Sequence, residues 1–163
     1  MKKLQILLLF ILIGACNSNE TTTYYLIRHA EKDRTNPTNR NPNLNSEGLI
    51  RASNWAKYFE TVALDAVYSS DYKRTQQTAE PTAAEKSLLI QFYDPNNMYD
   101  AIFQKVTLGK SVLVVGHSNT TPAFVNLILE QEKYQSMNDK DNSSLYVVTI
   151  QNRKKTSRVV RIH

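Results

Sequence analysis

The chain has 163 residues and a mass of 18.7 kDa, a length that fits a single domain. Hydrophobic residues make up 41% of it, enough for a buried core, which excludes a wholly disordered chain. The net charge of +5 comes from dispersed basic residues, so no nucleic-acid-binding arm is expected. A single Cys excludes an internal disulfide and a Cys-based zinc site, and three His leave little material for a metal centre.

The N-terminus has the pattern of an export signal. Two lysines, Lys2 and Lys3, precede an unbroken apolar stretch over residues 6–13. A helix that crosses a membrane needs about 20 apolar residues, and this stretch is too short for one. A short basic start, a brief apolar segment and small residues before a cleavage site are typical of a secretory signal peptide. We therefore expect residues 1–15 to be a signal peptide.

The expected cleavage region contains the only Cys of the chain. The tetrapeptide Ile13-Gly14-Ala15-Cys16 resembles the lipobox of bacterial lipoproteins, in which the Cys is acylated and becomes the first mature residue. The resemblance implies a lipid anchor on Cys16, a polar tether over residues 16–22, and export to the bacterial cell envelope, on its periplasmic or outer face. An ordinary signal peptide with an incidental Cys is the alternative interpretation.

In the remaining chain, apolar runs typical of strands alternate with amphipathic helical patterns. The predicted strands are residues 24–27, 66–68, 88–93, 111–115, 144–151 and, at an edge, 158–162. The predicted helices are residues 47–60, 72–86, 97–106 and 122–130, the second of them broken near Pro81. This alternation predicts an α/β fold with a mainly parallel sheet that is covered on both faces, in one domain over residues 23–163.

Two polar segments lack a strand or helix pattern. Residues 33–46 contain five Asn and two Pro, so they form a loop that is either a solvated connection or part of a site. Residues 132–143 are also polar, and they fit either a lid or a simple loop.

Two of the three histidines directly follow predicted strands. His29 follows the first strand and His117 follows the strand over residues 111–115. The carboxyl ends of parallel strands lie along one edge of a sheet, where ligands of α/β proteins bind. Arg28 precedes the first of these histidines, and Arg74 lies just beyond the second strand. We therefore expect all four side chains to project toward one edge.

Such a cluster suits a phosphoryl group. Guanidinium groups match the geometry of phosphoryl oxygens, and their charge disfavours protonation of a neighbouring imidazole. A neutral imidazole is a nucleophile toward phosphorus. The residues therefore predict transfer of a phosphoryl group to His29, with the surrounding charges holding the oxygens.

Four segments, in order, resemble the motifs of the histidine phosphatase (phosphoglycerate mutase-like) superfamily. Residues 28–31 (Arg-His-Ala-Glu) are similar to its Arg-His-Gly signature, and residues 44–48 (Leu-Asn-Ser-Glu-Gly) to the Leu-Thr-x-x-Gly segment that opens its first helix. Residues 68–79 resemble its second-Arg motif, and residues 114–119 (Val-Val-Gly-His-Ser-Asn) its second-His motif. The order and spacing of these motifs hold across about residues 23–130.

The resemblance implies a three-layer α/β/α sandwich and a role for each matching residue. His29 is the residue that becomes phosphorylated, and Arg28, Arg74 and His117 bind the phosphoryl oxygens. No metal or organic cofactor is implied. Ala30 departs from the usual Gly, and Arg74 is only 43 positions from His117, as in short members that include the phosphohistidine phosphatases.

The general acid for the leaving group is less clearly marked. Asp94 follows the third predicted strand at the correct edge, although the Asp-Pro pair that it forms with Pro95 is also common in turns. Glu31 and Asp100 are weaker candidates. A substrate with a good leaving group, such as a phosphohistidine or an acyl phosphate, needs no strong acid.

The leading hypothesis is a metal-independent phosphatase that hydrolyses a phosphomonoester through a phosphohistidine at His29. Its expected partners are a phosphorylated small molecule or a phosphoprotein, and a membrane through Cys16, but no nucleic acid. The alternatives are a phosphohistidine protein phosphatase and a non-catalytic lipoprotein that binds a phosphoester.

Overall fold

The structure is a computed structural model that describes residues 20–162. The predicted signal peptide and the lipidation of Cys16 fall outside these residues and stay predictions. Among the described residues, no helix is long and apolar enough to cross a membrane.

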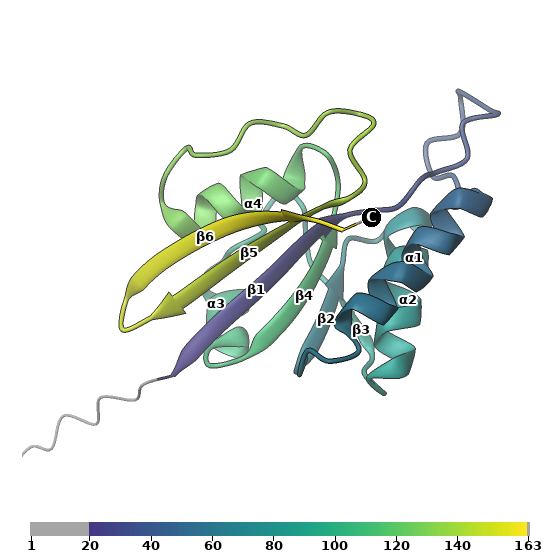
Figure 1. Cartoon of the computed structure of the whole chain (residues 1–163). Helices are drawn as coiled ribbons and strands as arrows, with labels where there is room; N and C mark the ends of the chain where they lie inside the picture. Colours follow the sequence, from purple (N-terminus) through teal and green to yellow (C-terminus); the bar gives the residue numbers. More distant parts are fainter. Residues whose placement is uncertain (1–19, 163) are drawn as a thin grey trace, which may run out of the picture.

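A central sheet of six strands organises the chain, in the order β3-β2-β4-β1-β5-β6 (Figure 1). The strands are β1 (Thr21–Arg28), β2 (Ala66–Ser69), β3 (Ile90–Phe92), β4 (Ser111–Gly116), β5 (Ser144–Gln151) and β6 (Lys154–Arg161). Strands β3, β2, β4 and β1 pair in parallel, whereas β5 and β6 are antiparallel additions beside β1. The sheet is therefore mixed, with its parallel part on the β1–β3 side.

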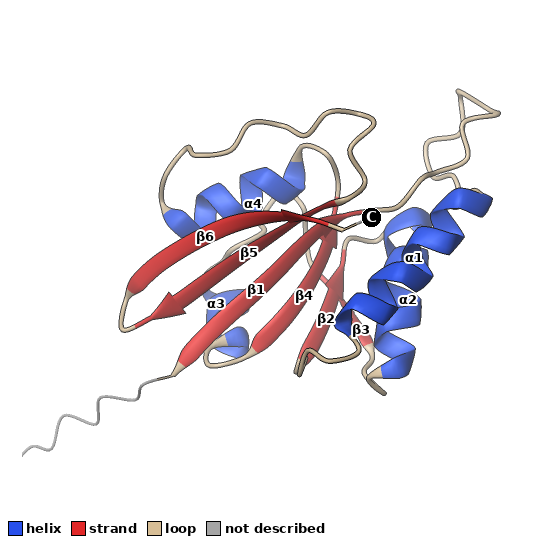
Figure 2. Cartoon of the chain, viewed as in Figure 1, coloured by secondary structure: helices blue, strands red, loops and turns tan. Residues whose placement is uncertain are grey.

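Four helices cover the two faces of the sheet. They are α1 (Ser46–Phe59), α2 (Lys73–Glu85), α3 (Ala101–Thr107) and α4 (Thr120–Leu129). Helices α1 and α2 lie on one face, and α3 and α4 lie on the other (Figure 2). The α/β class and the layering of helices on both faces of the sheet are confirmed.

The alternation of side chains along the strands divides the core between these two faces. In β1, Tyr24 and Leu26 face α3 and α4, whereas Ile27 faces α1 and α2. Strand β4 alternates in the same way: Val112 and Val114 face α3 and α4, and Leu113 and Val115 face α1 and α2. A strand buried on both faces is apolar throughout, which is why the central strands were the easiest to predict.

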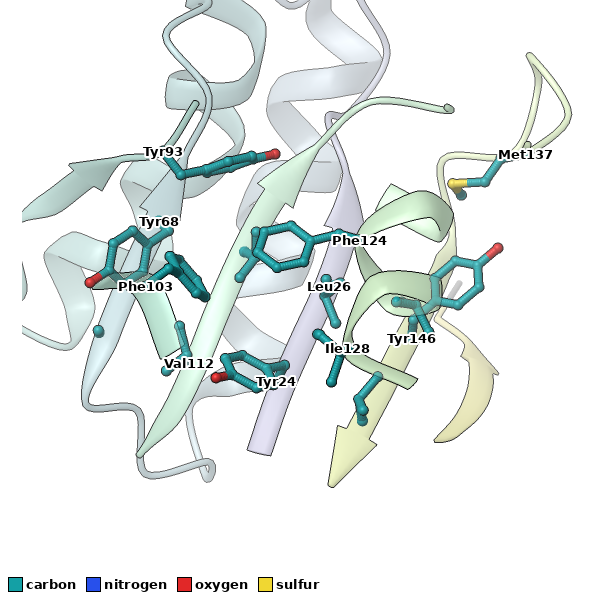
Figure 3. Close-up of a cluster of buried hydrophobic side chains, with 14 residues drawn as sticks. Tyr24, Leu26, Tyr68, Tyr93, Phe103, Val112, Phe124, Ile128, Met137 and Tyr146 are labelled. Carbon is teal, nitrogen blue, oxygen red and sulfur yellow. The ribbon is translucent and has the colours of Figure 1, made fainter. Parts of the chain in front are cut away.

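Aromatic side chains fill the first of these faces. Phe103 from α3 and Phe124 from α4 meet with ring centroids 5.2 Å apart, and Tyr24 and Tyr68 join them from the sheet (Figure 3). Met137, from the loop between α4 and β5, packs on the same cluster. Together with Tyr134, which packs on the same cluster, Met137 anchors this loop.

Strand β3 is shorter than the predicted 88–93, and α3 begins at Ala101 rather than at residue 97. Three further differences have a structural reason. Helix α2 is continuous, so the expected break at Pro81 is wrong: the proline removes one helical hydrogen bond, but burial of Ala79, Thr82 and Ala83 holds the helix. Strand β1 begins at Thr21, inside the segment assigned to the tether. Strand β6 begins at Lys154 because residues 152–153 form a tight hairpin turn with positive φ, a turn usually signalled by Gly.

Candidate active site

The parallel register of β1 and β4 brings the two histidines together. Arg28 pairs with Gly116 at the strand ends, and the backbone N–H of His29 donates to the carbonyl of Gly116 at 2.9 Å. The residues that follow, His29 and His117, therefore emerge side by side, with ring centroids 5.5 Å apart. Arg28 and Arg74 lie around the same strand ends, so the structure brings the four predicted groups to one place.

The backbone around His29 is held from three sides. Besides the contact with β4, the carbonyl of His29 accepts a hydrogen bond from Asn142 Nδ2 at 2.8 Å. The N–H of the next residue, Ala30, donates to Thr78 Oγ1 of α2 at 2.9 Å. The position of the His29 ring is thus fixed by the sheet, by α2 and by the loop before β5.

One ring nitrogen of His29 is hydrogen-bonded to the backbone, and the other carries the lone pair. His29 Nδ1 lies 2.7 Å from the carbonyl oxygen of Ala30. A carbonyl only accepts, so Nδ1 carries the proton of the neutral ring. The lone pair is then on Nε2, which is the form of imidazole that attacks phosphorus.

The environment keeps this ring neutral. The pKa of His29 is lowered to about 3, first by burial and then by the charges of Arg28 and Arg74, while the bond to Ala30 acts in the opposite direction. The sequence predicted the effect of the arginine charges; burial, which the sequence did not reveal, is the larger cause. The ring of His29 is therefore neutral throughout the physiological pH range.

Arg28 is buried, and both its Nη1 and its Nη2 are hydrogen-bonded to the protein. Its Nη1 donates to the backbone carbonyls of Asn138, Asp139 and Asp141 at 2.9–3.2 Å. Its Nη2 donates to Asp139 Oδ1 at 2.9 Å, and the same carboxylate is also bound by Arg34. Arg28 thus holds the loop of residues 130–143, between α4 and β5, against the end of β1.

Arg74, at the start of α2, has fewer partners. Its guanidinium group lies 4.5 Å above the ring of Tyr72, and Nη2 lies 3.4 Å from His117 Nδ1. Within residues 20–162, four buried side-chain polar atoms lack a hydrogen-bond partner, and two of them are Arg28 Nε and Arg74 Nε. Both guanidinium groups are near enough to His29 for their charges to lower its pKa, and an unpartnered guanidinium N–H group is a donor suited to an anion.

A polar pocket of about 760 Å³ opens beside His29. It is lined by the loops that follow β1 and α4 and by the first turn of α1. The lining residues are His29, Glu31, Lys32, Asp33, Arg34, Thr35, Asn45, Glu47, Asp139, Lys140 and Asn142. Every one of these side chains is polar or charged. The segment 33–46 therefore contributes to the pocket rather than only connecting β1 to α1.

The close approach of α1 to this pocket depends on Gly48. A Cβ at this position would lie 2.1 Å from the backbone oxygen of Glu31. The N-cap of α1, Asn45, is bound to the same oxygen through its backbone N–H at 2.9 Å, and its side chain accepts from Gly48. The Gly of this segment thus seats the helix against the residues that follow His29.

The candidate acids are in different places. Asp94 is exposed, does not line the pocket, and accepts from the backbone N–H of Asn96 at 2.8 Å, which is the turn role that its place before proline also predicts. Asp100 caps α3 by accepting from Phe103 at 2.7 Å. Glu31 does line the pocket, but both its oxygens accept from Arg51 Nε, at 2.7 and 2.9 Å.

Several residues of the site carried no sequence signal strong enough to single them out. Asn142 and Thr78 hold the backbone at His29, Ser70 bonds to the ring of His117 at 2.9 Å, and Asp139 bridges two arginines. Ser70 and Thr78 lie inside the segment that resembles the second-Arg motif, and this resemblance is the sequence feature that could have indicated them. Asn142 and Asp139 lie more than 100 positions from His29, and only the fold brings them near it.

Residues 24–94 of the chain match the sequence model of the histidine phosphatase superfamily (branch 1). The matched segment contains His29, Arg28 and Arg74. A search of the curated proteins found no match. The match extends from β1 to the residues just after β3, and it is a likeness of that part of the chain to the superfamily.

Several solved structures have a similar fold. Phosphoglycerate mutase from Bacillus anthracis superposes with a TM-score of 0.66 at 16% identity, covering 88% of this chain and 94% of the mutase. Alpha-ribazole phosphatase from Shigella flexneri gives 0.64 at 15% identity, covering 85% and 96%. SixA from Agrobacterium tumefaciens, which carries the name phosphohistidine phosphatase, gives 0.60 at 18% identity, covering 85% and 97%. At these identities the likeness shows the fold.

Proposed function

We propose that the protein is a phosphatase that hydrolyses a phosphomonoester through a phosphohistidine at Nε2 of His29. One observation carries the proposal: a buried imidazole with its Nε2 lone pair free stands beside two guanidinium groups whose Nε–H groups have no partner within the described residues. The superfamily match supports phosphatase chemistry in general.

The reaction proceeds in two displacements. In the first, His29 Nε2 attacks phosphorus, the P–O bond to the leaving group breaks, and the leaving oxygen takes up a proton. In the second, water attacks the phosphohistidine, the N–P bond breaks, and inorganic phosphate leaves with the neutral ring restored. Arg28 and Arg74 stabilise the negative charge on the transferring oxygens in both steps. The tautomer set by Ala30 keeps Nε2 as the attacking atom.

The pocket favours a polar leaving group. Every side chain that lines it carries a polar or charged group, and these groups can form hydrogen bonds with a hydroxyl- or amine-bearing alcohol. The pocket thus favours a class of substrate rather than one compound.

A second candidate, dephosphorylation of phosphohistidine or an acyl phosphate, has one observation in its favour. Of the four carboxylates that line the pocket, Glu31 is paired with Arg51, and Asp139 is paired with Arg28 and Arg34. Asp33 accepts from the backbone N–H of Thr35, so Glu47 is the one that has neither an ion pair nor such a bond among the described residues. Carboxylates held in ion pairs are poor proton donors, and these substrates have leaving groups that require little protonation. The open pocket also leaves room for a protein side chain.

The test is hydrolysis of para-nitrophenyl phosphate, whose activated leaving group needs no acid, in the presence of a chelator. We expect turnover in the wild type and a loss of at least about 1,000-fold in His29→Ala, because the nucleophile is removed. Rapid quenching in base should trap a phosphoprotein in the wild type that His29→Ala lacks. Full activity of His29→Ala would overturn the proposal. Binding of phosphate without turnover of this ester or of acetyl phosphate would indicate a binding protein instead.

A further inference from the structure

His117 has a hydrogen-bond partner on each ring nitrogen, and these partners determine where its proton resides. Nδ1 lies 3.4 Å from Arg74 Nη2, and Nε2 lies 2.9 Å from Ser70 Oγ. A guanidinium group has only donors. Nδ1 must therefore be the acceptor in the first contact, so the lone pair of the neutral ring is on Nδ1.

The hydroxyl groups on the other side of the ring lead independently to the same assignment. Thr75 Oγ1 lies 2.8 Å from the carbonyl of Ser70 and 2.9 Å from that of Tyr72, so its own proton goes to a carbonyl oxygen. The hydroxyl of Ser70 donates to Thr75 Oγ1 at 3.2 Å. With its proton used there, Ser70 Oγ is left as an acceptor, and the proton that it accepts is on His117 Nε2.

Ser70 and Thr75 are both fully buried, so water does not compete for these hydrogen bonds. We propose that Ser70 is a positioning residue that fixes His117 as the Nε2–H tautomer, opposite to the Nδ1–H tautomer of His29. In the free site, His117 then offers a lone pair beside Arg74. It becomes a donor to a phosphoryl oxygen only when Nδ1 takes up a proton.

The surroundings of His117 explain why Nδ1 takes up a proton only when an anion binds. The ring faces Arg74 and Tyr72 from the start of α2 and His29 from the end of β1, and the charges that act on it, from Arg74, Arg28 and Lys32, are all positive. Burial, followed by these charges, lowers its pKa to about 4. A bound phosphoryl group compensates the positive charges, and its own proton or one from solvent then moves to Nδ1.

The free protein provides the direct test, which does not depend on the proposed function. The full chain has only three histidines, so two-bond ¹H–¹⁵N correlation spectra of the labelled protein at pH 7 can be assigned with His29→Asn and His117→Asn. We expect a protonated Nε2 in His117 and a protonated Nδ1 in His29. The same tautomer in both rings, or exchange between tautomers in His117, would overturn the assignment.

The role of Ser70 is tested by Ser70→Ala with Ser69→Ala as the matched control. Ser69 is equally buried, but its hydroxyl donates to the backbone carbonyl of Ser70 at 2.8 Å and does not contact His117. In Ser70→Ala we expect the His117 signals to lose the single tautomer, with a roughly tenfold fall in kcat/KM from the loss of one hydrogen bond. The His29 signals should not change. Unchanged His117 signals in Ser70→Ala would contradict the positioning role.

Addition of inorganic phosphate tests the proton uptake, which rests on the proposed anion site. We expect the His117 Nδ1 signal to move from the unprotonated to the protonated range as phosphate saturates, while Ser69→Ala behaves like the wild type. Saturation with both rings still neutral would overturn proton uptake at His117. If calorimetry shows no phosphate binding, the anion site itself fails, whereas the tautomer assignment is still decided by the spectra of the free protein.

Discussion

The two histidines of the site stand side by side but are held by different kinds of contact. His29 is fixed through backbone groups: its ring bonds to the carbonyl of the next residue, and its main chain contacts β4, α2 and the loop before β5. His117 is fixed through side chains, by Ser70 on one nitrogen and Arg74 on the other. The difference fits the proposed roles, in which His29 attacks from a fixed position and His117 changes its partner and protonation when an anion binds.

The two arginines also differ in their contacts. Substituting each by Ala should therefore distinguish an effect on activity from an effect on the free energy of unfolding. Arg74→Ala should lower kcat/KM by about 100-fold or more, because a charged donor to the transferring oxygens is lost, with little change in the free energy of unfolding. Arg28→Ala should lower activity to a similar degree and also destabilise the fold by about 2 kcal/mol, because three loop carbonyls lose their donor.

Urea denaturation of both variants, beside kinetics, measures the two effects. Equal free energies of unfolding for Arg28→Ala and Arg74→Ala would contradict the view that Arg28 also holds the loop of residues 130–143.

The depressed pKa values of the two rings predict how stability depends on pH. Both are lowered from 6.5, that of His29 to about 3 and that of His117 to about 4. Below pH 6.5 the unfolded chain therefore binds more protons at these rings than the folded protein does, so the free energy of unfolding falls as pH is lowered. After allowance for solvent screening, we expect a loss of about 2 kcal/mol between pH 6.5 and 4.5.

Urea denaturation at these two pH values tests this prediction, with His29→Asn and His117→Asn each expected to reduce the loss. The loss of stability that comes from His29 should continue to lower pH than the loss that comes from His117, because the pKa of His29 is lower. A loss of the same size in the double variant would assign the pH dependence to other groups.

The smallest expected effect concerns Asp139, which lines the pocket and whose carboxylate accepts a hydrogen bond from Arg28 Nη2. Asp139→Asn removes a negative charge that an incoming phosphate must displace or approach, so the Kd for inorganic phosphate should fall by about two- to fivefold. Asp65→Asn is the matched control, because Asp65 lies at the opposite ends of the strands, next to Ser111. Weaker phosphate binding by Asp139→Asn would instead show that this carboxylate is needed to position Arg28.

The regular elements were predictable to the extent that their signals were local. The buried central strands carry continuous apolar runs, and the helices carry amphipathic periods, so class and layering followed from the pattern. The continuity of α2 through Pro81 was not predictable, because it depends on packing against the sheet. The start of β6 was missed because its turn uses Asn152 and Arg153 at positive φ without a glycine.

The sequence by itself determined which chemistry is present: two histidines after strands, two arginines close to strand ends, and four motifs in the order of a known superfamily. Only the tertiary structure decided which of these groups are buried, which nitrogen atoms are free, and that Ser70, Asp139 and Asn142 belong to the site. The physical reason is that burial and hydrogen-bond partners arise from contacts between segments up to 113 positions apart. Such contacts leave no trace in local composition or periodicity.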